Sequence, residues 1–197
     1  MSNRKLLVIA ALAALVNTAW AQQPETNVEV TKSMGAATFK GTTRMTATVQ
    51  DIDAATRTVL LKGANGKVVE VEVGDEARNF DQLKVGDVVK VVYRESLSLS
   101  LKKNGNGITS AEETPSMERA PAGAKPGGTL GREIKITANV VAVNHKTKTV
   151  TLQGPKGNQV DLKIEDPAQL AHIKKGDQVD VVYTEALAVS VEPVAAK

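Results

Sequence analysis

The sequence Tyr-x-Glu occurs twice in this chain, as Tyr93 with Glu95 and as Tyr183 with Glu185. A phenol and a carboxylate placed in a cleft could bind a ligand, or the two carboxylates could serve a hydrolase. The structural alternative is a barrel corner, in which each Tyr caps the barrel and each Glu bonds to backbone. We favour this structural role, because buried Tyr hydroxyls normally find a hydrogen-bond partner. The four residues stay as candidate ligand-binding residues.

The remaining residue types offer no catalytic residue, metal ligand set or cofactor site. The chain has no cysteine and two histidines, His145 and His172, which belong to no His-x-x-x-His pair. No Ser-His-Asp or Cys-His arrangement can be proposed, and the glycines lack the spacing that cradles phosphate. We therefore predict a protein that is not an enzyme and that has no cofactor and no metal site.

The Tyr-x-Glu pairs belong to a unit that occurs twice, about ninety residues apart. Thr46–Asp53 is matched by Thr137–Asn144, and Val85–Glu95 is matched by Lys175–Glu185. In each unit an alternating apolar pattern slips by one residue, at Ile52 in the first. A step of three inside an alternating strand is what a β-bulge produces.

Each unit predicts the element order β-β-β-short helix-β-β. Pairs of apolar residues spaced by three predict the helical turn, Phe80 with Leu83 and Leu170 with Ile173. The fifth strand of the first unit is expected at Leu97, Leu99 and Leu101. The fold class is therefore all-β, as two tandem small five-stranded OB-fold-like barrels with a short helix between strands three and four. SH3-like barrels are the alternative.

Composition and pattern divide the chain into six parts. These are a signal peptide (1–21), a flexible N-terminal arm (22–43), the first barrel (44–103), a linker (104–131), the second barrel (132–193) and a C-terminal tail (194–197). Within the linker, Ser110–Arg119 is polar and could form a brief helix.

The first 21 residues predict export to the periplasm. Arg4 and Lys5 precede an apolar run of eleven residues, and Ala19 and Ala21 form an A-x-A cleavage site before Gln22. The run is too short to span a bilayer, so we expect no stable membrane insertion after cleavage. An exported chain without cysteine must be stabilised by packing alone.

The charge balance excludes nucleic acid as an expected partner. The chain has 25 Lys and Arg against 22 Asp and Glu, and removing Arg4 and Lys5 with the leader leaves a net charge of +1. The four aromatic residues of the mature chain include none on strands two and three, where OB folds stack bases. The partner is unknown, and an envelope protein is the class we consider.

The chain resembles a group of exported proteins of Gram-negative bacteria whose activity is uncharacterised. The resemblance covers nearly the whole mature chain. Its motifs are the Thr-Ala-Thr-Val start at Thr46, the Thr-x-Thr-Val strand at Thr56, the turn at Arg78–Asp87 and the Tyr-x-Glu-Ala-Leu-Ala ending at Tyr183. Tyr93–Leu97 departs from this ending, with Ser96 in place of Ala.

A more distant likeness is to small periplasmic copper-binding OB-fold proteins. It rests on the Lys-x-Gly-Asp turn followed by a valine-rich strand, at Lys84–Val92 and Lys174–Val182. That family binds copper with a His, a Trp and two Met on barrel strands, and this chain has no matching positions. The hypothesis is a non-enzymatic exported protein of binding or structural role; the alternatives are a periplasmic metal-binding or metal-delivery protein and a hydrolase that uses the Tyr-x-Glu carboxylates.

Overall fold

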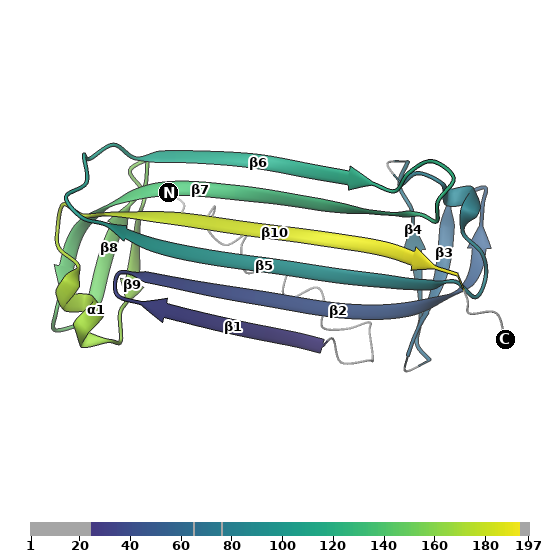
Figure 1. Ribbon diagram of the computed structural model, residues 1–197, viewed down its shortest axis with the longest axis horizontal. Helices are drawn as coiled ribbons and strands as arrows, with labels where there is room; N and C mark the ends of the chain where they lie inside the picture. The colour runs from purple at the N-terminus through teal and green to yellow at the C-terminus, as the bar shows by residue number, and fades with distance from the viewer. Residues whose placement is uncertain (1–24, 65, 76, 194–197) are drawn as a thin grey trace, which may run out of the picture.

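The protein is all-β, as the sequence predicts. The computed structural model describes residues 25–64, 66–75 and 77–193, which form one antiparallel sheet of ten strands (Figure 1). Two short helical segments, η1 (Phe80–Gln82) and α1 (Pro167–His172), accompany the sheet. The signal-cleavage residues Ala19, Ala21 and Gln22 and the tail at 194–197 lie outside the described residues.

Six strands make up the long middle of the sheet. Across it the order is β1, β2, β5, β10, β7 and β6, with every neighbouring pair antiparallel. The four inner strands have 15 to 18 residues each. The bounds are β1 Glu25–Ser33, β2 Ala36–Asp53, β5 Val88–Lys102, β6 Ser110–Arg119, β7 Gly127–Asn144 and β10 Gln178–Glu192.

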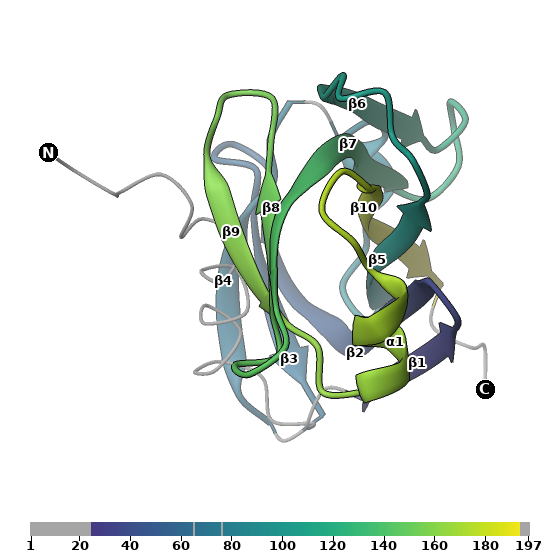
Figure 2. The same cartoon turned by 90° about the vertical axis from the view of Figure 1, so that its left-hand side faces the viewer.

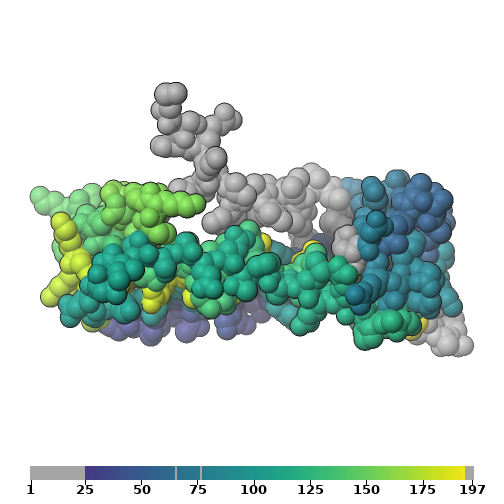
Figure 3. All heavy atoms as spheres, turned by 90° about the horizontal axis from the view of Figure 1, so that it is seen from above, coloured from purple at the N-terminus to yellow at the C-terminus, as the bar shows by residue number. Residues whose placement is uncertain are grey.

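A small lobe lies at each end of the six long strands. The first lobe contains β3 (Thr58–Gly63), β4 (Val68–Glu72) and η1, and the second contains β8 (Thr149–Gln153), β9 (Gln159–Lys163) and α1. Seen from above, β3 and β4 (blue) and β8 and β9 (lime) rise from the same side of the long strands (Figure 3). The sheet therefore has an inner face, which looks into the space between the lobes, and an outer face.

The two tandem five-stranded barrels are not confirmed, because the predicted fourth and fifth strands are one strand. β5 continues without a turn from Val88 to Lys102. Its odd-numbered residues keep one face throughout, from Val89 and Val91 to Leu99 and Leu101. Ser96 is the one turn-forming residue of the Arg94-Glu95-Ser96 segment between them, which has no Gly, Pro, Asn or Asp. The sheet is open, with β4 and β9 at its free ends.

The predicted bulge and helical turns are confirmed in both halves. The β2–β3 register shifts between Val49 and Asp51, and the β7–β8 register shifts between Val140 and Ala142. The spacing of three at Phe80 and Leu170 corresponds to η1 and α1. The bulge turns β2 and β7 from the flat middle into the lobes, because an extra residue on one strand increases the local bend and twist.

Each lobe completes its core with a strand that enters it from the opposite half of the chain. The first core holds Val49, Val59 and Phe80, and Val189 and Val191 of β10 pack against it. The second core holds Val140, Val150 and Leu170, and Leu99 and Leu101 of β5 pack against it. The two halves are therefore interlocked through β5 and β10.

The segments predicted as a flexible arm and a linker differ from that prediction, since both contain strands. β1 pairs with β2 and forms a hairpin in residues 25–44, and β6 pairs with the first half of β7. Their polar composition hid them because both are edge strands with every residue exposed. Pro115 is compatible with β6 because an edge strand has one row of backbone groups that pairs with nothing.

Amide side chains at matching positions of the two helical segments hold these hairpins. Gln169 accepts a hydrogen bond from the Gly35 backbone N–H and donates to the Ser33 carbonyl oxygen, at 2.9 and 2.6 Å. Asn79 donates to the Pro121 carbonyl oxygen and accepts from the Gly123 N–H, at 2.6 and 3.3 Å. Each lobe thus clamps the hairpin of the opposite half.

The shared strands predict a single unfolding transition for both lobes. Leu99→Ala removes a side chain of β5 from the second core and should destabilise the protein by about 2 kcal/mol, the low end for leucines because Leu99 is half-buried. Urea unfolding is followed by tryptophan fluorescence in Leu83→Trp and Ile173→Trp, which report the first and second lobes in a mature chain without tryptophan.

Leu99→Ala should lower the unfolding midpoint equally with both reporters. A midpoint that falls only with the Ile173→Trp reporter would show two independent domains and contradict the interlocked fold.

Candidate site on the inner face

The two Tyr-x-Glu pairs meet at the centre of the molecule. β5 and β10 pair so that Glu95 lies directly opposite Glu185, Tyr93 opposite Leu187, and Tyr183 opposite Leu97. All of these residues have the parity of the core-facing residues of the same strands, so they lie on the inner face. The structure therefore places the motif in the middle of a sheet and not at a barrel corner.

One carboxylate organises the centre. Glu185 Oε1 accepts a hydrogen bond from Arg132 Nε at 2.6 Å, and this contact is also an ion pair. Glu185 Oε2 accepts from the hydroxyl of Tyr183 at 2.9 Å and, more weakly, from that of Tyr93 at 3.4 Å. Arg132 lies beside Glu185 in the β7–β10 register. The carboxylate of Glu185 is thus held by side chains, and among the described residues it bonds to no backbone group.

The other carboxylate lacks this support. Glu95 lies beside Gly41 in the β2–β5 register, where the matching place next to Glu185 holds Arg132. A Cβ at Gly41 would lie 3.0 Å from both Cγ and Oε1 of Glu95, so the Glu95 side chain occupies the space over this glycine. No hydrogen bond or ion pair joins the exposed Glu95 carboxylate to a described residue. The centre is therefore asymmetric, with one neutralised and one unpaired acid.

Both phenols act as hydrogen-bond donors and remain protonated. Burial raises the pKa of Tyr93 above its ordinary value, and the nearby carboxylates of Glu185 and Glu95 raise it further. Burial also raises the pKa of Tyr183, as does its hydrogen bond to Glu185. A tyrosine with a raised pKa is neutral at physiological pH and cannot serve as a general base there. Glu185 is paired with Arg132, so the two Tyr-x-Glu carboxylates are not both free, as the hydrolase alternative requires.

Apolar side chains surround this polar centre on the inner face. Phe39 lies beside Leu97, and Leu130 lies beside Leu187, so that apolar rows flank the Glu95–Glu185 row on both sides. Six of these inner-face side chains are exposed by more than a third: Val28 (65%), Val30 (50%), Phe39 (37%), Met117 (53%), Leu130 (46%) and Leu187 (39%). Together with Leu97 these side chains form an apolar strip in two parts, one on β1, β2 and β5 and the other on β6, β7 and β10, with the polar centre between them.

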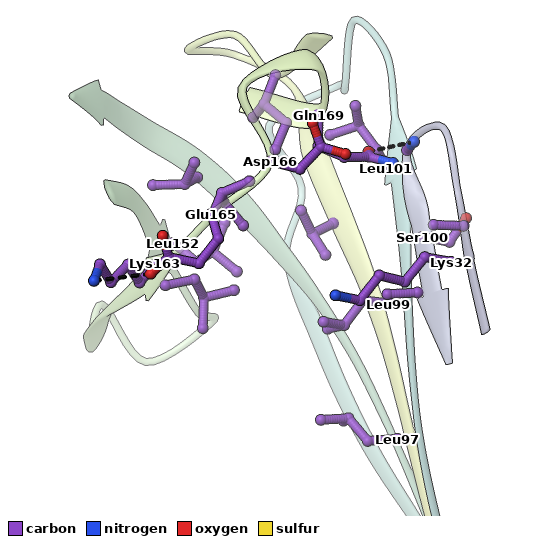
Figure 4. Close-up of a pocket in the computed structure, with 18 of the residues that line it drawn as sticks. Lys32, Leu97, Leu99, Ser100, Leu101, Leu152, Lys163, Glu165, Asp166 and Gln169 are labelled. Carbon is purple, nitrogen blue, oxygen red and sulfur yellow. Dashed lines mark hydrogen bonds and ion pairs between the residues drawn. The ribbon is translucent and has the colours of Figure 1, made fainter. Parts of the chain in front are cut away.

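A cavity of about 430 Å³ adjoins the strip at the second lobe (Figure 4). One wall consists of side chains from β8 and β9, and the other consists of side chains from β2 and β5. Phe39 and Leu97 belong to both the strip and the cavity lining. The cavity is therefore continuous with the inner face.

The Gly-Asp turns form buried ion pairs that the sequence did not reveal. Asp177 is 3% exposed and accepts from the Lys174 N–H at 2.8 Å and from Lys103 Nζ at 2.6 Å. Burial alone would raise the pKa of Asp177, but Lys103 and the backbone N–H groups outweigh it and lower the pKa. Asp87 has the same arrangement with Lys125.

The two lysines occupy different positions of the repeated unit, so comparing the copies could not find them. The carboxylates of Asp87 and Asp177 already accept hydrogen bonds from these lysines and from backbone N–H groups. This supports a structural role for the Gly-Asp turns, at the start of β5 and β10, and not a role as ion-binding loops.

The histidines are not brought into a ligand set. His145 lies in the turn between β7 and β8, and His172 ends α1. Within the described ranges, no group of three or more His, Cys, Asp or Glu side chains is arranged to hold a metal ion.

Comparisons with known proteins do not assign this chain to a family. No protein family, no curated protein and no solved structure matches this chain, and nothing in these comparisons points to an enzyme. None of the helical segments in the described part of the chain has the length and apolarity that crossing a bilayer requires.

The two tyrosines predict a pH dependence that can be measured directly, because they are the only tyrosines of the chain. A raised folded-state pKa means that their stabilising contribution is complete below the unfolded value of about 10 and is lost as the pH rises through the folded value. Ultraviolet titration should show both phenols ionising above pH 10 in the folded protein and near pH 10 in urea.

Glu185→Gln should lower the pKa of Tyr183 toward the ordinary value, since the charged acceptor is gone. Glu192→Gln removes the same charge from an exposed residue of β10 and should leave the titration unchanged. Tyrosines that titrate alike in folded and unfolded protein would disprove the hydrogen-bonded centre.

Proposed function

We propose that this chain is a non-enzymatic exported protein that binds an apolar ligand on the inner face of its sheet. The observation that carries this proposal is the exposed strip across the inner face. Large exposed apolar patches rimmed by polar residues on a soluble protein often mark a binding site, whereas single exposed apolar residues do not. The two lobes rise from the same side of the sheet, one at each end (Figure 3), and ligand sites are characteristically concave.

The polar centre supports a binding role over a purely structural one. The ion pair between Arg132 and Glu185 is partly exposed, and such a pair gives little net stabilisation, so stability alone does not account for charged side chains in the middle row. Here Glu185 and Arg132 occupy the middle row, the two tyrosines lie in the rows beside it, and Glu95 has no partner among the described residues. A few placed polar groups within an apolar surface orient a ligand and give specificity.

The periplasm is the proposed location. The charged start, the short apolar run and the A-x-A sequence at Ala19–Ala21 support it. The absence of cysteine is consistent with a fold that relies on sheet pairing and two packed cores. We also propose that each lobe descends from an OB-like unit, because the order of three strands, a short helix and a further strand is kept in both. The resemblance to exported proteins of Gram-negative bacteria belongs to the same proposal.

Export can be tested by expressing the full chain in a Gram-negative host. The periplasmic fraction should hold a protein whose intact mass corresponds to a chain that begins at Gln22, because cleavage follows Ala21. Substituting Ala19 and Ala21 with Arg should block cleavage and retain the longer chain with the membrane. A full-length chain in the cytoplasmic fraction of the unaltered protein would overturn this location.

Binding on the inner face can be tested with the neutral dye Nile red, whose fluorescence rises in apolar surroundings. The double variant Leu130→Gln with Leu187→Gln makes this part of the strip polar and should weaken dye binding about thirtyfold, since the two exposed leucines each contribute of order 1 kcal/mol of apolar contact. Val92→Gln places the same change on the outer face of β5 and should leave dye binding unchanged. Equal binding by all three proteins, with unchanged circular dichroism, would remove the basis of the proposed function.

A further inference from the structure

The cavity in the second lobe is the place on the inner face that can enclose a ligand. Its walls are aliphatic: Leu152 and Leu162 face it from β8 and β9, while Leu99 and Leu101 face it from β5. The volume of about 430 Å³ lies within the range of small-molecule sites. Such a lining offers dispersion contacts and few hydrogen bonds, and therefore suits a hydrocarbon chain.

The cavity exists because the second lobe curls without closing. β9 is the last strand of the sheet and pairs only with β8, so no ladder joins it to β2 across the gap. α1 spans this gap and is fixed to the β1–β2 turn by Gln169. Viewed from the end of the molecule, β8 and β9 lie on one side, and β5, β2 and β1 lie on the other (Figure 2).

The first lobe stabilises the corresponding region with an arginine that the second lobe lacks. Arg57 donates to the carbonyl oxygens of Val73, Gly74 and Ala77 at 2.9 to 3.0 Å, and its guanidinium lies 4.7 Å from the centre of the Phe80 ring. Lys148 follows the matching loop with the same positive φ and instead forms a 3.8 Å ion pair with Glu165. The second lobe is thus left without this internal clamp.

One cation is available for a ligand at the mouth of the cavity. Lys32 extends from β1 toward the cavity, as Figure 4 shows, and its ammonium forms no ion pair with a described residue. The other charged side chains of the lining are engaged: Lys163 pairs with Glu165 at 2.8 Å, and Asp166 caps α1 by accepting from the Ala168 N–H at 2.8 Å.

We propose that this cavity binds a free fatty acid, with the hydrocarbon chain between the β8–β9 wall and the β5 wall and the carboxylate on Lys32. The assignment rests on the proposed function and names its ligand class. A methylene group is about the size of a water molecule, roughly 30 Å³, so the cavity has room for a single chain of about ten to fourteen carbons. A two-chain lipid exceeds this volume.

Calorimetric titration with decanoate and with decanol tests the assignment. The mature protein should bind decanoate, and Lys32→Gln should weaken that binding about tenfold while leaving decanol binding unchanged, because decanol has the same chain and no charge. Lys40→Gln removes an equally exposed lysine from the outer face of β2 and should change neither. Ala37→Phe fills the cavity and should abolish binding of both. Phe39→Trp, at a site 37% exposed, is the filling variant to use if Ala37→Phe does not fold.

The outcomes separate this inference from the proposed function. Nile red binding without decanoate binding overturns the fatty-acid assignment and leaves the inner face as a binding surface. If the unaltered protein binds neither Nile red nor decanoate, both proposals are overturned. Decanoate binding that is equal in Lys32→Gln and the unaltered protein overturns the role of Lys32, and binding that survives both filling variants places the ligand outside the cavity.

Discussion

The pairing of β5 with β10 is the constraint on which the rest of the structure depends. These strands run antiparallel over fifteen residues each and form the centre of the sheet. Because each strand begins in one lobe and ends in the other, the pairing carries Leu99 and Leu101 into the second core and Val189 and Val191 into the first. Neither lobe has a complete core from its own half. The marginal stability expected of units of about sixty residues is thereby avoided, since one cooperative body buries more surface than two small ones.

The same register places Glu95 directly opposite its counterpart Glu185, whereas each tyrosine lies opposite a leucine. Glu95 faces Glu185 because this pair lies at the centre of the antiparallel register between β5 and β10. Two like charges in direct opposition destabilise a sheet, and the chain resolves this in one half only, with Arg132 and two phenols around Glu185. Gly41 holds the matching place beside Glu95 and leaves room for its side chain. The repulsion is thus relieved by an asymmetric arrangement, and a symmetric pair of arginines is absent.

Local features could be predicted from the sequence, and long-range pairing could not. The bulges near Ile52 and Val143, the helical turns at Phe80 and Leu170 and the inward valines depend on residues within a few positions of one another. The open sheet depends on a turn that does not occur near Glu95. The odd-numbered residues from Val89 to Leu101 are apolar or aromatic except Glu95, and this single charged residue in the pattern favoured two strands where the structure has one. Every residue of β1 and β6 is exposed, and their large apolar side chains on the inner face are few, Val28 and Val30 on β1 and Met117 on β6, so these strands are recognised only through their partners.

The candidate site could likewise be predicted only in part, because some of its residues occur in both halves of the chain and others in one. Tyr93, Glu95, Tyr183 and Glu185 could be singled out because they repeat, whereas Arg132, Lys32 and the cavity could not, because they have no counterpart in the other half. A fold made of matched halves keeps its matched residues for pairing and packing, where both halves obey the same geometry. What differs between the halves is then free of that constraint: the arginine clamp of the first lobe, the open cavity of the second, and the single unpaired lysine at its mouth. Specific binding in this protein is therefore expected where the two halves disagree, on the side of the sheet that both lobes enclose.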